Sequence, residues 1–180
     1  ERGPCPDAAD YGYNERFSNK TAIAPTASIS IICGGASPGV EPVAANSYTH
    51  KTLSGSFNVR NRYLVELLEK HGKNTDDVWS EITTNQGSVS HLDFLTDLEK
   101  DVFKTAFELD QKWIIELSGD RTPYISQAQS INLFVPADIH KRELHKIHFD
   151  AWKKGLKSLY YCRSKSIQRA ENVNDTKATD

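Results

Sequence analysis

The apolar positions of the chain first recur at helical spacing from Tyr63 onward. Gly72 follows this stretch and is a suitable C-terminal cap for a helix. A second helix is expected to start after Asn74 or Thr75. The positions that define the first helical face are Leu64, Leu67 and Leu68.

The clearest helical pattern begins at Thr96. Thr96 and Glu99 have the spacing of a capping box, which pairs the two ends of a helix's first turn. Gly119 ends the pattern shortly before Pro123. The pattern therefore predicts one helix from residue 96 to residue 119. Its apolar face is expected to consist of Val102, Phe103, Ala106, Leu109, Trp113 and Leu117.

A strand pattern and a helix pattern alternate between Ser130 and Cys162. Apolar residues alternate over 131–135 until Pro136 stops the run, and 156–162 reads as the next strand. Between them Asp138 opens a helix that Gly155 closes. A strand, a helix and a strand in this order build a parallel sheet, so the fold class is α/β. The inward residues of this helix are expected to be Leu144, Ile147, Ala151 and Trp152.

The two ends of the chain show no such periodicity. Residues 1–20 are rich in Gly, Pro, Asp and Asn, and the segment Gly3-Pro4-Cys5-Pro6 is expected to hold neither a helix nor a central strand. Residues 21–24 predict a short strand that ends at Pro25 and breaks into a loop of small residues. Residues 171–180 are polar and are expected to be disordered.

Composition narrows the class of protein. The 180 residues are enough for one globular domain, and the net charge of -2 does not indicate nucleic-acid binding or an anionic-membrane anchor. The longest nearly apolar run, 29–33, is too short to span a membrane. Three separated cysteines favour a reducing compartment, and we expect a cytoplasmic protein. A chain that starts at Glu1 and lacks methionine is expected to have been trimmed, cleaved or excised from a longer one.

The first candidate site is the segment Ala24 to Ser28. Two hydroxyls and free backbone N–H groups after a strand could hold a phosphate, especially at a helix N-terminus. A capped turn is the alternative interpretation. No Walker pattern is present, so kinase chemistry is not expected.

The second candidate is the pair Tyr160 and Tyr161 at the end of a predicted strand. Taken alone, the pair is typical of a core strand, and stacking both rings would need a bend because successive strand side chains point to opposite faces. Cys162 could be a reactive thiol, but a small buried apolar side chain is the preferred interpretation.

The remaining polar candidates carry no hypothesis alone. His140, His145 and His148 could share a helix face, but the spacing matches no known metal motif, so no metal site is predicted. Glu41 and the pair Asp120-Arg121 could be catalytic, yet loop charges are usually solvated or hold a turn.

Several motifs in order resemble the large, catalytic subunit of class I ribonucleotide reductase, in a bacterial or bacteriophage style. The resemblance covers residues 1–170 and implies the C-terminal part of a ten-stranded α/β barrel, completed by another chain or segment. The motifs are Arg2-Gly3-Pro4-Cys5-Pro6, Arg16-Phe17-Ser18-Asn19-Lys20, Ile23-Ala24-Pro25-Thr26-Ala27-Ser28-Ile29-Ser30, Gly39-Val40-Glu41-Pro42, Thr49-His50-Lys51-Thr52-Leu53-Ser54-Gly55-Ser56-Phe57, Asp120-Arg121-Thr122-Pro123-Tyr124 and Leu159-Tyr160-Tyr161.

The resemblance implies roles for both candidate sites. In that family the loop matching Pro25, Thr26, Ala27 and Ser28 holds the phosphates of a nucleoside diphosphate, with Ala27 acting through its backbone. The residues matching Tyr160 and Tyr161 relay a radical from a metal cofactor in the small subunit to an active-site cysteine. The thiyl radical takes the 3′ hydrogen of the ribose, the 2′ hydroxyl leaves, and a cysteine pair supplies the electrons.

The resemblance also implies that much of the enzyme lies outside this chain. Cys5, Cys33 and Cys162 do not match the family's catalytic or redox cysteines, so thioredoxin or glutaredoxin would act through cysteines elsewhere. We expect no cofactor in this chain and ATP or deoxynucleotide effectors bound elsewhere. The expected partners are the N-terminal and central part of the large subunit and the radical-generating small subunit, in a bacterial cell or a phage-infected host.

Three origins are compatible with these motifs. The leading hypothesis is a naturally split or cleaved large subunit, and a piece of an ordinary full-length subunit would have the same chemistry. The alternative from another class is a noncatalytic assembly module left by a broken gene. In each case we expect a barrel fragment to expose apolar surface and sheet edges, and so to fold poorly or associate tightly with its complement.

Overall fold

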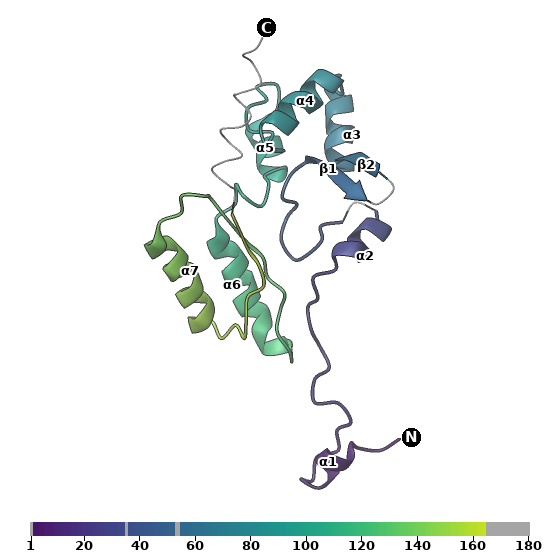
Figure 1. Cartoon of the computed structure of the whole chain (residues 1–180), viewed down its shortest axis with the longest axis vertical. Helices are drawn as coiled ribbons and strands as arrows, with labels where there is room; N and C mark the ends of the chain where they lie inside the picture. Colours follow the sequence, from purple (N-terminus) through teal and green to yellow (C-terminus); the bar gives the residue numbers. More distant parts are fainter. Residues whose placement is uncertain (1, 35, 53–54, 165–180) are drawn as a thin grey trace.

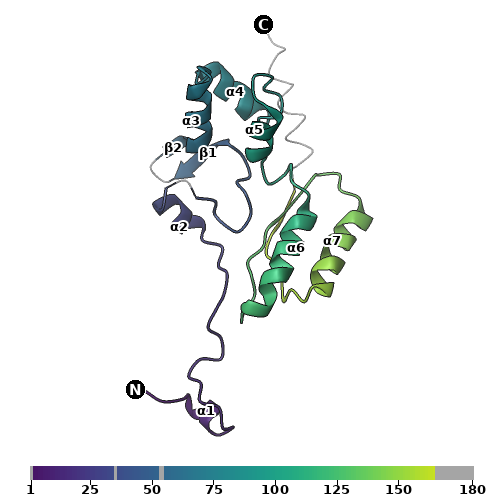
Figure 2. The ribbon, with the colours of Figure 1, turned by 180° about the vertical axis from the view of Figure 1, so that it is seen from behind.

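The computed structural model describes residues 2–34, 36–52 and 55–164. Figure 1 shows an extended N-terminal arm and two lobes, and Figure 2 shows the same arrangement from behind. The arm ends in the single turn α1 (Pro6–Ala9) and leads to α2 (Ala27–Ile32). The helical lobe and the sheet lobe follow in chain order.

The helical lobe comprises a hairpin and three helices. β1 (Ser47–Thr52) pairs antiparallel with β2 (Gly55–Arg60), and α3 (Arg62–Lys70), α4 (Asp76–Thr84) and α5 (Asp97–Val102) follow. The apolar faces of α3 and α4, whose buried positions recur at helical spacing, meet the segment between α4 and α5 in one core. The core consists of Leu64, Leu68, Trp79, Ile82, Val89, Leu92 and Leu95.

Three helix ends predicted in this lobe are confirmed, namely the end of α3 and the starts of α4 and α5. Gly72 adopts a left-handed conformation (φ 63°) just after α3, a conformation that glycine adopts at low cost. The Thr75 side chain accepts a hydrogen bond from Val78 N–H and so caps α4. The capping box of Thr96 and Glu99 is formed in both directions. Local cap chemistry is thus sufficient to place these ends.

Glu99 gives this lobe an acid-sensitive contact. Its carboxylate lies 2.9 Å from His71 Nε2 and also accepts hydrogen bonds from Thr96, which together lower the pKa of Glu99 from 4.5 to about 2. Because the folded pKa is below the unfolded one, the stabilisation is present above pH 4.5 and is lost as pH falls toward 2. We expect urea unfolding of the chain to show this loss between pH 5 and pH 2 and Glu99→Gln to reduce it. An unchanged pH dependence in Glu99→Gln would contradict the assignment.

The single helix predicted over 96–119 is wrong. The chain leaves the helix after Val102 and begins a new one, α6 (Gln111–Arg121), with the Asp110 side chain as its N-cap. In between, Glu108 accepts hydrogen bonds from the Thr105 backbone and hydroxyl, which stabilises a turn. Gly119 does not end α6 but leaves room for Lys154, whose side chain would meet an added Cβ.

The break changes which side chains α6 buries. The predicted inward residues Trp113 and Leu117 are exposed, as is Val102 in α5. The helix restarts at Gln111, so its phase is set anew and does not continue that of α5. The residues that α6 buries are Gln111, Ile114, Ile115 and Ser118.

The strand, helix and strand unit predicted over 130–162 is confirmed as the sheet lobe. β3 (Leu133–Val135) pairs in parallel with β4 (Cys162–Ser164), and α7 (Lys141–Lys153) connects them. Side chains of α6, β3 and α7 share a small core of Ile115, Leu133 and Ala151. Two details differ from the prediction. The N-cap of α7 is His140 and not Asp138, and β4 is shorter than the strand predicted over 156–162 and begins only at its last residue.

Trp152 is a further correction. It was expected to face inward but is 70% exposed, because α7 turns Ala151 and partly Ile147 toward the core. Consecutive helical residues lie about 100° apart, so Trp152 cannot share the inward direction of Ala151.

The N-terminal segment contains more helix than predicted. Pro6 lies at the first position of α1, where its missing N–H and fixed φ cost nothing. Residues 27–32, expected as a loop, form the helix α2. The predicted strand at 21–24 is reduced to an isolated parallel bridge between Ile23 and Gln129. The predicted disordered tail, 171–180, lies outside the described residues.

No helix within the described ranges combines the length and the apolar character needed to cross a membrane.

Candidate functional site

Both candidate segments border the same stretch of chain, residues 127–135, which includes β3. On one edge, Ser130 N–H donates to Ile23 O at 2.9 Å. On the other edge, Tyr160 N–H donates to Ile131 O and Leu133 N–H donates to Tyr161 O, both at 2.8 Å. Hydrogen-bonding directions alternate along a strand, which is why residues 130 and 131 serve opposite neighbours.

This arrangement sets the spacing between the two candidates. Neighbouring strands lie about 4.8 Å apart, so Ile23 and Tyr160 are separated by two spacings, roughly 10 Å between backbones. The segment Pro25 to Ser28 follows Ile23 directly in the chain. The structure therefore brings to one small parallel sheet two segments that are more than a hundred residues apart in sequence.

The segment Pro25 to Ser28 forms the start of α2. Thr26 is the N-cap and has a left-handed backbone (φ 44°, ψ 26°), and its side chain makes no capping hydrogen bond among the described residues. The first-turn N–H groups of a helix have no intrahelical partner, so those of Ala27 and Ser28 point outward. Ala27 and Ser28 are exposed, whereas Ser30 is buried with its hydroxyl donating to Ala27 O at 2.7 Å.

The simple capped-turn interpretation of this segment is therefore wrong. A capping turn would use the Thr26 hydroxyl on the helix's own N–H groups, but that bond is not made. The hydroxyls of Thr26 and Ser28 and the backbone N–H groups are chemically suited to an anion.

Tyr160 and Tyr161 lie at the entry to β4. Their ring centroids are 4.1 Å apart and the ring planes are tilted by 53°. Tyr160 and Tyr161 are 46% and 53% exposed, so the core-strand interpretation is wrong. Residues 160 and 161 precede β4 and are bonded to Ile131 and Leu133 through their backbones, and their rings still lie against one another.

The electrostatic surroundings of the tyrosines are asymmetric. A hydrogen bond with the Tyr161 side chain raises the pKa of Tyr160 above its ordinary value of 10.0, and burial adds to the effect. The Arg163 guanidinium lies 5.2 Å from the centroid of the Tyr161 ring, within range of a cation–π interaction. The proton of Tyr160 is therefore held more strongly than that of an isolated phenol.

The other polar candidates differ in whether they are exposed or bonded within the fold. Cys162, expected to be buried, is exposed. Arg121 donates to Gln129 Oε1 at 3.1 Å and to Ser118 Oγ at 2.9 Å, which ties the end of α6 to the central strand. No group of three or more His, Cys, Asp or Glu side chains among the described residues is arranged to hold a metal.

Glu41 is the position that sequence reasoning undervalued. It is not solvated but 4% exposed, and its carboxylate accepts hydrogen bonds from the backbone and the side-chain amide of Asn132. Its place in the motif Gly39-Val40-Glu41-Pro42 was a signal, but its partner lies 91 residues away.

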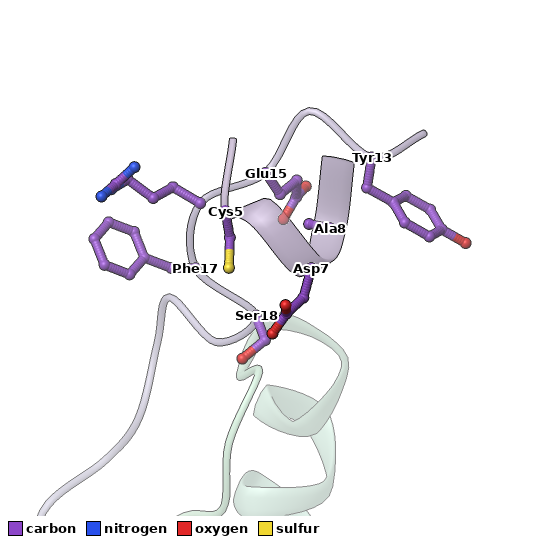
Figure 3. A pocket seen from close by; sticks show the side chains of 8 residues that line it. Cys5, Asp7, Ala8, Tyr13, Glu15, Phe17 and Ser18 are labelled. Atoms are coloured by element: carbon purple, nitrogen blue, oxygen red, sulfur yellow. The ribbon is translucent and has the colours of Figure 1, made fainter. Parts of the chain in front are cut away.

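A hollow of about 590 Å³ lies beside α1 at the tip of the arm. Figure 3 shows the side chains around it, with Cys5 and Phe17 on one side of α1 and Tyr13 on the other. The hollow is far from the sheet that carries the two candidates (Figure 1). It therefore contributes nothing to their chemistry.

The fold is a mixed α/β fragment with a parallel strand, helix and strand unit at its centre. A family model for the barrel domain of ribonucleotide reductase matches residues 7–162. The chain belongs to the class I ribonucleotide reductase large-subunit family and corresponds to part of that family's barrel domain.

Individual relatives agree with this assignment. The ribonucleoside-diphosphate reductase large subunit of Invertebrate iridescent virus 6 is 52% identical over 177 residues, which cover 96% of this chain and 18% of that protein. The subunit alpha of Chlamydia trachomatis is 39% identical over 87% of this chain and 15% of its own length. A solved structure, the class Id ribonucleotide reductase alpha subunit of Actinobacillus ureae, superposes with a TM-score of 0.77 at 41% identity. The superposition covers 87% of this chain and 28% of the Actinobacillus ureae subunit.

The chain thus spans less than a third of the length of these relatives. They come from an invertebrate virus and from bacteria, and a further relative, 34% identical, is the large subunit of Danio rerio. The bacterial or bacteriophage setting stays a prediction.

Proposed function

We propose that this chain forms part of a ribonucleoside-diphosphate reductase and supplies two pieces of its active site. The segment Pro25 to Ser28 binds the substrate diphosphate, and Tyr160 and Tyr161 carry the radical. The observation that carries the proposal is that Ile23, two residues before Pro25, and the tyrosine pair are bonded to opposite edges of the same stretch, with the backbones of Ile23 and Tyr160 roughly 10 Å apart. The reaction itself, reduction of a ribonucleoside diphosphate, is inferred from the family to which the chain belongs.

The phosphate segment acts through hydrogen-bond donors. An anion can accept hydrogen bonds from the hydroxyls of Thr26 and Ser28 and from the N–H groups of Ala27 and Ser28. No capping hydrogen bond of Thr26 has to be broken first. The positive end of the helix adds a smaller attraction, since α2 is short. These contacts orient the ribose for the chemistry and take no part in bond breaking.

The tyrosine pair acts by coupled transfer. Tyr161 loses an electron and a proton to the incoming radical site, and Tyr160 then loses an electron and a proton to Tyr161, which becomes a phenol again. Ring centroids 4.1 Å apart and the influence of the Tyr161 side chain, which raises the pKa of Tyr160, suit this exchange. The radical then passes to a cysteine in the remainder of the large subunit, where hydrogen abstraction from C3′ begins reduction. Loss of the 2′ hydroxyl as water consumes two electrons, which a cysteine pair gives up by forming a disulfide.

The proposal requires partners and a compartment. The remainder of the large subunit completes the ten-stranded barrel, and the small subunit supplies the radical from its metal cofactor. Deoxynucleotide and ATP effectors bind outside this chain, and thioredoxin or glutaredoxin restores the cysteines. We place the complex in the cytoplasm.

Dependence on this chain is the direct test. The chain, the remainder of the large subunit and the small subunit are mixed, and reduction of a labelled ribonucleoside diphosphate is followed. We expect deoxynucleotide only when all three are present. If the same amount of deoxynucleotide formed without this chain, only the interpretation as a noncatalytic assembly module would remain.

A further inference from the structure

One edge of residues 127–135 changes its bonding partner where the candidate phosphate segment departs. Ser130 N–H donates to the backbone of Ile23. The next N–H on that edge, from Asn132, is accepted by the Glu41 carboxylate, and the one after that, from Phe134, by Gln111 Oε1 at 2.9 Å. Two side chains therefore continue the ladder after the neighbouring backbone has turned away at Pro25.

The Glu41 carboxylate is built into this position. It is buried and bonded to Asn132 twice, through the backbone N–H and through the side-chain amide at 3.3 Å. The Ser37 hydroxyl donates to the Glu41 carbonyl and fixes the loop around it. Gly39 makes the close approach possible, because a Cβ there would collide with the carboxylate. Burying a carboxylate is unfavourable unless it is bonded, so this geometry is specific.

The bond closes a loop around the phosphate segment. Residues 24–40, which contain Pro25 to Ser28 and α2, are attached at one end through Ile23 to Ser130 and at the other through Glu41 to Asn132. Ser130 and Asn132 are two residues apart on a strand, about 7 Å. Both ends of the segment are therefore fixed to the same short stretch of the central strand.

Asn132 points away from the helices. Its neighbour Leu133 packs against Ile115 of α6 and Ala151 of α7, and successive strand side chains face opposite ways. Its Oδ1 is buried and has no hydrogen-bond partner among the described residues. The Glu41 contact thus lies on the face of the sheet that α6 and α7 leave open.

We infer that Glu41 is a positioning residue for substrate phosphate binding, acting through Asn132. This inference rests on the proposed function. The carboxylate does not touch the substrate but holds the second end of residues 24–40, and so fixes where Thr26 and Ser28 present their donors. The tyrosine pair is bonded to the opposite edge of the strand, through Ile131 and Leu133, and is not held by Glu41.

The test uses the complete large subunit with its small subunit. Glu41→Ala is expected to raise KM for the ribonucleoside diphosphate about tenfold, the effect of losing a buried bonded anchor, with kcat within about twofold. Glu41→Gln keeps one acceptor and, after a flip of the Asn132 amide, gains a donor to Oδ1, so its KM rises by no more than about threefold. Glu66→Ala, on the exposed side of α3, is the matched control and should change neither constant.

A charge swap separates positioning from general destabilisation. Asn132→Asp alone places two carboxylates together and should raise KM as Glu41→Ala does. The double variant Glu41→Gln with Asn132→Asp restores the bonding with exchanged donor and acceptor and should return KM to within about twofold of wild type. A fall in kcat at unchanged KM, or no recovery in the double variant, would overturn the inference.

The combined variant Thr26→Val with Ser28→Ala distinguishes this inference from the proposal beneath it. If that variant raises KM and Glu41→Ala does not, Glu41 has no positioning role and the phosphate segment stands. If it leaves KM unchanged, the phosphate role itself fails, and the Glu41 inference fails with it.

Discussion

Replacing Tyr161 by phenylalanine in the complete large subunit is expected to reduce ribonucleotide reduction to background. The phenylalanine ring keeps the 4.1 Å packing against Tyr160 but lacks the hydroxyl that gives up the proton. It also removes the hydrogen bond that raises the pKa of Tyr160. Tyr160→Phe is expected to have the same effect, because a relay fails when either station is lost. Turnover of a labelled ribonucleoside diphosphate with the small subunit present measures both.

The control for this prediction is Tyr124→Phe. Tyr124 is largely exposed at the end of the short 3-10 helix η1 (Thr122–Tyr124), which follows α6, and Tyr124→Phe should retain full turnover. Substrate affinity, measured separately at equilibrium, should be unchanged in all three variants, because the tyrosines lie on the opposite strand edge from Pro25 to Ser28. Full turnover in both Tyr160→Phe and Tyr161→Phe would refute the relay and leave an assembly role.

Trp79→Ala is expected to be the most destabilising substitution in the helical lobe. Trp79 is 2% exposed, packs in the centre of the core, and donates from Nε1 to Asn74 Oδ1 at 2.7 Å. Its removal leaves a large cavity in the core, at a cost of about 3–5 kcal/mol. Urea unfolding of the chain, followed by far-ultraviolet circular dichroism, measures the loss.

Trp113→Ala is the matched substitution. Trp113 lies on the solvent side of α6 and is 63% exposed, so its removal should cost less than about 1 kcal/mol. Equal losses for the two tryptophans would show that residue 79 is not the centre of an independent core.

The helical boundaries that could be predicted are those set within a few residues. Thr75, Thr96 and Gly72 carry their capping chemistry in their immediate sequence, and the structure uses each as expected. The parallel strand, helix and strand unit was also predictable, because Pro136 marks the end of its first strand and Gly155 follows the end of its helix.

The chain forms no single helix over 96–119 because two capping signals interrupt it. Thr105 with Glu108, and then Asp110, are cap residues in the middle of the apolar pattern, and they stop and restart the helix. A single helical phase extended across that break predicts that Trp113 faces inward. The structure turns it outward.

The candidate site depended on information that local patterns do not contain. The motif resemblance selected Pro25 to Ser28 and the tyrosine pair, but spacing alone favoured a capped turn and a core strand. Periodicity could not show that Tyr160 and Tyr161 face each other before β4 begins. Nor could it pair Glu41 with Asn132, since that bond spans 91 residues.

The bonds that assemble the central sheet have a consequence for the order of folding. Thr21 meets Ser126 across 105 residues, whereas the helical lobe closes its core within a few dozen residues. Closing long loops costs more entropy and slows contact formation. The helical lobe can therefore form first and bring the arm and the sheet lobe closer together. Pro25 to Ser28 acquire their final place only when the long loop between Ile23 and Ser130 has closed.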